Sequence, residues 1–207
     1  MIEGLAEVTQ VVMDKTGTLT SGRFAVEDTI GQTVDKETLI RDAAYAECHS
    51  NHPIAIGIKE AYGRDIDEHL LTEVKEIAGR GMMVIMDGHE ILAGNRKLMQ
   101  DHGVDCPAYD TAGTLVYVAR DDEFEGCVVL RDQLKEDALD TVKALHDAGR
   151  KCWIVSGDNA AITKDMADRL GVDGYFAECL PADKVEHLKK LAGNGKTAFV
   201  GIGRAHV

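Results

Sequence analysis

The chain has 207 residues and a formal net charge of −13 at pH 7. This charge argues against nucleic acid or an anionic membrane surface as a partner, while 44% hydrophobic and 29% charged residues are typical of a globular protein. No segment approaches the ~20 consecutive apolar residues of a membrane span, and the start lacks the pattern of a signal peptide. The five cysteines are scattered without a Cys-x-x-Cys pair, so we expect reduced thiols rather than disulfides or a zinc site.

The first predicted element is a buried strand at 8–13, rich in β-branched residues. It leads directly into Asp14-Lys15-Thr16-Gly17-Thr18-Leu19-Thr20. An acid at the carboxyl end of such a strand lies where open α/β folds bind their ligands. Gly17 allows a sharp turn that brings backbone N–H groups close to an anion. Because a carboxylate can attack a phosphoryl group, the heptad predicts that Asp14 is a nucleophile beside a phosphate cradle rather than part of an ordinary turn.

The middle of the chain is typical of an α+β unit with an antiparallel sheet. A polar break at 21–23 and a strand at 24–30 precede helices at 37–46 and 54–62, the second of them starting at Pro53. Further strands are predicted at 71–77, 82–86, 90–93, 114–119 and 126–130, with a short helix at 96–99. Asp87-Gly88 is a strong hairpin signal between two of these strands.

From Asp132 onward, helices and strands alternate. The predicted order is helix 132–148, strand 151–155, helix 159–170, strand 175–177, a helix around 185–188, and strand 197–200. This order predicts a parallel sheet with right-handed crossovers. Because the first strand has no helix directly after it, the simplest topology is one α/β domain, residues 1–22 and 130–207, interrupted by an inserted domain at 23–129.

Two further polar turns carry candidate chemistry. In Ser156-Gly157-Asp158-Asn159, the serine hydroxyl and the N-terminus of the following helix can both donate to a phosphate. The alternative is that Asp158 and Asn159 only cap that helix. Lys184 lies near a helix start, where the helix dipole does not favour a cation, which indicates either a place at the phosphate site or an ordinary surface lysine.

The heptad at 14–20 resembles the phosphorylation signature of the P-type ATPases, within the haloacid dehalogenase superfamily. The resemblance implies a Rossmann-type parallel sheet in which Asp14 becomes an aspartyl phosphate. It also implies that Lys184 neutralises the phosphoryl group, and that further ligands of the phosphate are Thr18, Ser156, Gly157, Asp158 and Asn159. Thr16 stands where the superfamily's phosphatases carry an acid that activates water, and a threonine is no general base at neutral pH. The acyl phosphate should therefore persist, as a pump requires.

The predicted insertion resembles the nucleotide-binding domain of the heavy-metal class of P-type ATPases. The resemblance rests on Glu47, His52-Pro53, Gly79-Arg80-Gly81 and Gly94-Asn95 in that order, although each of these alone has an ordinary structural explanation. It implies that ATP binds here, with Glu47 at the adenine edge and His52 near the ring. Gly79 and Gly81 would let the backbone approach the nucleotide, and Asn95 would complete the pocket.

The resemblance also implies Mg²⁺, held by Asp14 and the Thr16 carbonyl. The parent protein would carry transmembrane and actuator domains at the cytoplasmic face of the cell membrane and export a metal cation bound elsewhere. Zinc, cadmium or lead is favoured over copper. After Val200 the family continues Gly-Asp-Gly, but this chain reads Gly201-Ile202-Gly203, and isoleucine cannot bind magnesium.

We therefore expect a truncated chain with a non-native tail that binds nucleotide but phosphorylates poorly. Two alternatives remain at this stage. One is a free-standing phosphatase of the haloacid dehalogenase type, which Thr16 disfavours. The other is a nucleotide-binding regulator without catalytic activity, which is suggested only by Ile202.

Overall fold

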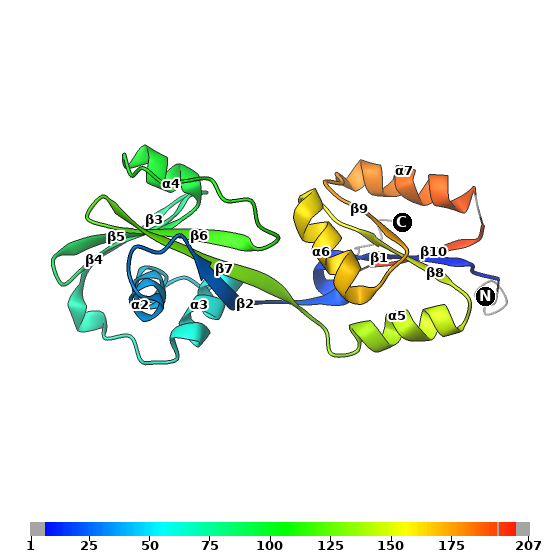
Figure 1. The fold of residues 1–207 in the computed structure, drawn as a ribbon, viewed down its shortest axis with the longest axis horizontal. Helices are drawn as coiled ribbons and strands as arrows, with labels where there is room; N and C mark the ends of the chain where they lie inside the picture. The colour runs from blue at the N-terminus through cyan, green and yellow to red at the C-terminus, as the bar shows by residue number, and fades with distance from the viewer. Residues whose placement is uncertain (1–6, 194, 202–207) are drawn as a thin grey trace. The chain divides into compact units, whose positions relative to one another are not determined.

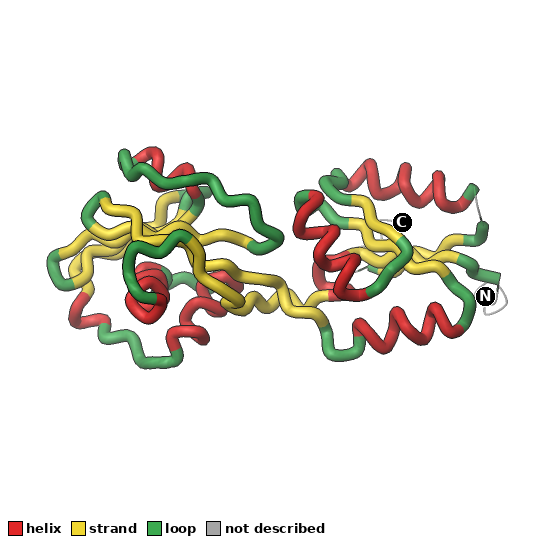
Figure 2. The backbone as a smooth tube through the Cα atoms, in the orientation of Figure 1, coloured by secondary structure: helices red, strands yellow, loops and turns green. Residues whose placement is uncertain are grey.

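The computed structural model describes residues 7–193 and 195–201, and the chain divides into two compact units. The first unit combines the N-terminal segment up to Gly22 with the segment from Gln133 onward, and the second is Arg23–Asp132. Each unit has its own sheet covered by helices (Figures 1 and 2). The predicted combination of a parallel α/β sheet with an antiparallel α+β sheet is confirmed.

The first unit contains a four-stranded parallel sheet in the order β10-β1-β8-β9. Its strands are β1 (Gln10–Asp14), β8 (Lys151–Val155), β9 (Gly174–Phe176) and β10 (Thr197–Val200). Asp14 pairs in register with Val155, so the loops that follow β1 and β8 leave the same edge of the sheet side by side. This edge is the carboxyl end of the strands, where the sequence predicted a ligand site.

Helices cover both faces of this sheet (Figure 1). They are α5 (Ala138–Asp147), α6 (Ala160–Leu170) and α7 (Pro181–Ala192). Val11 and Met13 of β1 pack with α5 and α6, whereas Val12 belongs to the cluster under α7. The side-chain period of two thus gives each face its own apolar core, as expected for a strand that is buried on both sides.

The second unit contains a six-stranded sheet in the order β2-β7-β6-β5-β4-β3, antiparallel from β3 through β7. The strands are β2 (Thr20–Ile30), β3 (Leu71–Ile77), β4 (Gly81–Met86), β5 (His89–Gly94), β6 (Thr114–Arg120) and β7 (Glu123–Leu134). Helices α2 (Lys36–Ala46) and α3 (Pro53–Tyr62) pack on one face, and α4 (Arg96–Asp101) packs on the other (Figure 1). A short 3₁₀ turn, η2 (Glu68–Leu70), precedes β3.

Two sequence predictions are wrong where the chain passes between the units. Strand β2 begins at Thr20 and runs through the predicted polar break, and β7 continues to Leu134, so α5 begins at Ala138 and not at Asp132. The polar residues at these positions are typical of a break and of a helix start. In the structure β2 and β7 are neighbouring strands, and their backbone groups form hydrogen bonds with each other. The Ser21 hydroxyl also donates to the Gln133 carbonyl at 3.3 Å. Among the helices that the structure describes, none is long and apolar enough to cross a membrane.

Candidate active site

Asp14 is the last residue of β1, and its carboxylate is contacted by Lys184 of α7. The Lys184 amine donates to Oδ1 of Asp14 at 2.9 Å. Both side chains remain partly accessible, with 26% of Lys184 and 20% of Asp14 exposed. The strand end and the first turns of α7 therefore bring together two residues that the sequence nominated from segments 170 positions apart. A cation beside an accessible carboxylate is a suitable arrangement for binding an incoming anion.

The loop after Asp14 is a distorted turn, η1 (Lys15–Leu19), whose backbone leaves the helical region at Thr16 and Gly17. Gly17 has φ of 78°, a left-handed conformation that favours glycine, as the sequence predicted. The Thr20 hydroxyl closes the turn, since it accepts from Gly17 N and donates to the Lys15 carbonyl, both at 3.3 Å. Within residues 7–193 and 195–201, the Thr18 hydroxyl is buried without a hydrogen-bond partner. A phosphate oxygen could satisfy it.

The loop after β8 supplies the second half of this edge. The Ser156 hydroxyl donates to Oδ2 of Asp158 at 2.8 Å and accepts from Asp158 N at 3.1 Å. Lys15, which is only 5% exposed, places its amine 2.7 Å from the same Asp158 oxygen. The sequence reasoning gave Lys15 no role. Its position directly after the candidate nucleophile was the only available signal, and burial of a lysine cannot be read from one sequence.

The alternative that Asp158 and Asn159 only cap the helix holds for Asn159 but not for Asp158. Asn159 is the N-cap of α6, and its side chain accepts from Ile162 N at 2.9 Å. Asp158 instead binds Lys15 and Ser156 and so links the two loops of the sheet edge. Gly157 is exposed between them, and a Cβ added there would lie 3.5 Å from the Cys179 carbonyl, an ordinary contact. Gly157 is therefore not required for packing.

The second unit contains a cavity of about 340 Å³ that gathers all five residues predicted for a nucleotide pocket. These are Glu47, His52, Gly79, Gly81 and Asn95. Ten other residues line the cavity, from the loop after α2, from α3, from the sheet and from the β3–β4 hairpin: Ser50, Ile54, Glu76, Ile77, Arg80, Met82, Gly94, Thr114, Leu115 and Val116. Of these, the sequence motifs contained only Arg80 and Gly94, and they gave neither a role. Four of the ten, Ile77, Met82, Leu115 and Val116, are apolar strand residues whose only sequence signal was that of a core.

One wall of the cavity is the segment that joins α2 to α3. Glu47 is the C-terminal cap residue of α2 and is buried, which raises the pKa of its carboxyl, although a hydrogen bond with Ser50 opposes the shift. His52 is exposed and caps α3, where its Nδ1 accepts from Ile54 N at 3.3 Å. Lys59 fixes the segment by donating to the carbonyls of Cys48 and Ser50 at 3.2 and 2.7 Å. The wall thus presents an acid and an imidazole on a braced loop.

The opposite wall is built by close contact between the β3–β4 hairpin and the end of β5. A Cβ on Gly81 would lie 2.2 Å from the Ala93 carbonyl, and a Cβ on Gly94 would lie 2.3 Å from the Arg80 carbonyl. Asn95 joins the hairpin to α4, because its Nδ2 donates to the Gly79 carbonyl at 2.9 Å and its Oδ1 accepts from Leu98 N at 3.0 Å. Gly81 therefore has a packing role besides the predicted approach to a ligand.

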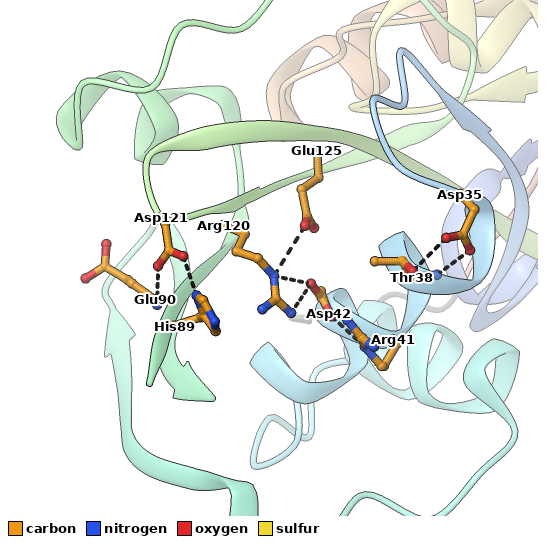
Figure 3. Close-up of polar contacts among 9 residues, drawn as sticks. All are labelled: Asp35, Thr38, Arg41, Asp42, His89, Glu90, Arg120, Asp121 and Glu125. Atoms are coloured by element: carbon orange, nitrogen blue, oxygen red, sulfur yellow. Dashed lines mark hydrogen bonds and ion pairs between the residues drawn. The ribbon is translucent and has the colours of Figure 1, made fainter. Parts of the chain in front are cut away.

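A buried charge cluster braces α2 against the sheet in the same unit (Figure 3). Asp42 is fully buried, and its carboxylate forms ion pairs with Arg41 Nε at 2.8 Å and with Arg120 Nη2 at 2.7 Å. Arg120 also lies 3.5 Å from Glu125, so its guanidinium stands between two carboxylates (Figure 3). Glu125 is the extra residue where the β6–β7 register shifts, and burial together with the Asp42 charge raises the pKa of its carboxyl to about 7.

No group of three or more His, Cys, Asp or Glu side chains that could hold a metal occurs among the described residues. Ile202, which the sequence placed at the expected magnesium position, lies outside them. The sheet edge offers two carboxylates, of Asp14 and Asp158, together with the hydroxyls of Thr18 and Ser156 and the backbone carbonyls of the loop after Asp14. Mg²⁺ is usually held by one or two carboxylates together with waters and phosphate oxygens, so this donor set is compatible with the ion.

Comparison with known proteins gives one family match over nearly the whole chain. A family model described as haloacid dehalogenase-like hydrolase matches residues 8–201. A zinc-transporting ATPase of Synechocystis is 37% identical over 98% of this chain and 29% of its own length. A probable copper-exporting P-type ATPase of Archaeoglobus fulgidus is 39% identical over 98% of this chain and 26% of its own length. The chain thus spans less than a third of either relative.

Solved structures give the same result. A zinc-transporting PIB-type ATPase in the E2.Pi state matches with a TM-score of 0.80 and 30% identity, covering 98% of this chain and 34% of that one. The catalytic domain of a CPx-ATPase, described in terms of conformational changes upon nucleotide binding, matches with a TM-score of 0.73 and 26% identity over 98% and 75%. The predicted resemblance to heavy-metal P-type ATPases is confirmed.

Proposed function

The chain belongs to the haloacid dehalogenase-like hydrolases, and on that premise we propose that it is the ATP-binding, autophosphorylating part of a heavy-metal-transporting P-type ATPase. The observation that carries the proposal is the contact between Asp14 and Lys184 at the carboxyl end of β1. In this contact the carboxylate that we propose as the nucleophile has beside it a cation that can offset phosphoryl charge. The similarity to zinc- and copper-transporting ATPases supports the same activity.

The proposed reaction is an in-line attack by an Asp14 carboxylate oxygen on the γ-phosphorus of ATP. A new oxygen–phosphorus bond forms while the bond to the β–γ bridging oxygen breaks, and ADP leaves with that electron pair. The buried Thr18 hydroxyl and the Ser156 hydroxyl are candidates to donate to the transferred group, and Lys184 to balance its charge. Gly157, Asp158 and Asn159 shape the loop beside it.

The fate of the acyl phosphate separates this proposal from a phosphatase. Thr16 is exposed on the loop after Asp14 but has no group that takes a proton from water at neutral pH. The phosphoenzyme should therefore survive long enough for a conformational step in the parent protein. A free-standing phosphatase of the same family remains the second candidate, since it uses the same nucleophile position.

The nucleotide is proposed to bind in the cavity of the second unit. Glu47 can accept a hydrogen bond from the adenine amino group, and the exposed ring of His52 can pack on the base. Gly79, where a Cβ would meet nothing within 4 Å, leaves the hairpin backbone open to the ligand, and Gly81 is proposed to let that backbone approach it through close packing on β5. Asn95 keeps the hairpin in place through Gly79. The cavity volume of about 340 Å³ lies in the usual range for small-molecule sites.

Mg²⁺ is the proposed cofactor, held by the Asp14 carboxylate and the Thr16 carbonyl together with phosphate oxygens and water. It would supply positive charge at the phosphoryl group. The parent protein is proposed to sit in the cell membrane with this part on its cytoplasmic face, next to transmembrane and actuator domains. Zn²⁺, Cd²⁺ or Pb²⁺ is the favoured cargo, and copper is the alternative, because relatives of both kinds are about equally similar.

Titration of the chain with ATP, alongside an assay with p-nitrophenyl phosphate, tests the proposal against its rival. A pump fragment should bind ATP saturably and should not turn over the small ester. The ester is the discriminating substrate because a phosphatase needs no nucleotide pocket. Rapid ester hydrolysis without ATP binding would overturn the proposal in favour of the phosphatase.

A further inference from the structure

Three aromatic rings form a column between the parallel sheet and α7. Trp153 of β8 stacks on Phe176 of β9 with ring centroids 5.8 Å apart and an interplanar angle of 21°. Phe176 in turn stacks on His187 of α7 at 4.2 Å and 20°. The column belongs to the same apolar cluster as Val12 and Val155, on the face that α7 covers. Stacked rings add attraction beyond the burial of their area and also restrict the relative orientation of the elements that carry them.

The surroundings of the column are shaped to fit the rings. A Cβ on Gly174 would lie 2.4 Å from the Trp153 ring, so only a glycine leaves room for the indole at that position of β9. In the part of the chain that the structure describes, Trp153 Nε1 and His187 Nδ1 are buried without hydrogen-bond partners. Burying a ring nitrogen unpaired is costly. We take this to mean that His187 contributes through the face of its ring.

The column meets α7 near the middle of the helix, at His187, one turn beyond Lys184. Leu180 and Val185 are 68% and 51% exposed, so their side chains contribute little to packing α7 on the sheet. Leu188 and Leu191 pack against the same cluster farther along the helix, and Gln10 Nε2 donates to the Leu191 carbonyl at 3.1 Å. Residues three apart share a helix face, so His187 stands one turn beyond Lys184 on the same side of α7. The His187–Phe176 stack is thus the ring contact of α7 that lies nearest along the helix to Lys184 among the described residues.

We propose that Phe176 and His187 are positioning residues for phosphoryl transfer, which keep the Lys184 amine against the Asp14 carboxylate by fixing α7 one turn beyond Lys184. The inference rests on the proposed function of Asp14 and Lys184. A lysine on a helix that can rock loses its fixed distance to the nucleophile. Displacements of about 1 Å in a catalytic group can reduce a rate by about 100-fold.

A double-mutant cycle tests this without requiring any phosphorylation. Urea unfolding of the full chain, followed by the fluorescence of Trp153, its only tryptophan, is measured for wild type, Asp14→Asn, Lys184→Gln and the double variant. The four proteins give the coupling between the two side chains, expected to be roughly fivefold in the unfolding equilibrium constant. The cycle is then repeated on a His187→Ala and on a His187→Phe background.

We expect the coupling to vanish with His187→Ala and to persist with His187→Phe, which keeps a ring to stack on Phe176. A role in stability alone would lower the stability of all four proteins equally and leave the coupling intact, and that result would overturn the inference. So would a loss of coupling with His187→Phe. Val185→Ala, an exposed change on the same helix, should leave the coupling unaltered. Failure of the proposed function would appear separately, as absence of phosphate on Asp14 in an Ile202→Asp variant, whatever the coupling.

Discussion

The Lys184 amine lies 2.9 Å from Oδ1 of Asp14, across a separation of 170 positions in the chain. The contact joins the end of β1 to the first turn of α7. A phosphoryl group that binds at this site could take the place of the Asp14 carboxylate as the ion-pair partner of Lys184. The lysine would therefore not have to move into the site when the substrate binds. Preformed charge of this kind lowers a barrier because little reorganisation is left for the reaction itself.

Lys184→Gln should slow phosphoenzyme formation by roughly 100-fold, since it removes one preorganised charge at the transferred group. The affinity for ATP should stay the same, because the proposed pocket lies in the second unit. The rate of acid-stable labelling from γ-labelled ATP is the measurement. Lys189→Gln, an exposed lysine on the same helix, is the matched control. An unchanged labelling rate in Lys184→Gln would remove this lysine from the mechanism.

His52→Ser should weaken ATP binding by roughly tenfold, through loss of the ring that stacks on the base. Serine is a good N-cap, so it retains the capping role of His52 at the start of α3. The comparison therefore separates a ligand contact from a stability effect. Calorimetric titration gives the affinity and thermal unfolding gives the stability. If His52→Ser bound ATP with the wild-type affinity, His52 would have no role in binding the nucleotide and would serve only as the N-cap of α3.

Gly94→Ala should lower the free energy of unfolding of the second unit by about 1–3 kcal/mol, because the added methyl meets the Arg80 carbonyl at 2.3 Å. It should also weaken ATP binding, since the hairpin that carries Gly79 and Gly81 must move away. Gly193→Ala is a suitable control, because nothing lies closer than 3.4 Å to a Cβ there. Urea unfolding and ATP titration of both variants check the prediction, which is wrong if the two behave alike.

The buried cluster on α2 predicts a pH-dependent stability. Burial, aided by the charge of Asp42, raises the pKa of Glu125 from 4.5 to about 7, so between these values the folded state binds more protons than the unfolded state. Stability from this group is therefore complete below the lower pKa and is lost as pH rises through the upper one. The free energy of unfolding should fall by about 1–3 kcal/mol over this pH range. Arg120, shared with Asp42, opposes but does not cancel the shift.

Glu125→Gln should abolish this part of the pH dependence, because the amide keeps the shape of the side chain without its proton equilibrium. Glu123→Gln, an exposed change on the same strand, should keep the wild-type profile. Urea unfolding between about pH 5 and pH 8 is the measurement. A Glu125→Gln profile parallel to that of the wild type would place the titrating group elsewhere.

The strand and the turns that position the site could be predicted from the sequence, because each depends on residues that are close together in the chain. The β-branched run before Asp14 and the glycine at position 17 are explained by burial and by a left-handed turn, and both features are present in the structure. The N-cap at Asn159 and the proline that opens α3 follow from the same local rules. Pairing of Lys184 with Asp14 followed from the parallel topology and the family resemblance together.

Long-range partners could not be read in the same way. Nothing local indicates that Lys15 is buried against Asp158, because a lysine in a polar turn is usually exposed. The polar stretch at 131–134 resembled a helix start, and only its pairing partner β2 makes it a strand. The Asp42–Arg120–Glu125 cluster depends on a one-residue register shift between β6 and β7, which no single strand pattern encodes (Figure 3).

The central claim is that Asp14 accepts the γ-phosphoryl group of ATP. The most direct test introduces an acid at the position where the family resemblance predicts a magnesium ligand, as Ile202→Asp, and maps the label from γ-labelled ATP and Mg²⁺ by mass spectrometry. We predict weak labelling of the wild type, stronger labelling of Ile202→Asp on the peptide that contains Asp14, and none in the Ile202→Asp, Asp14→Asn double variant. Labelling that survives Asp14→Asn, or its absence from Ile202→Asp, would contradict the account.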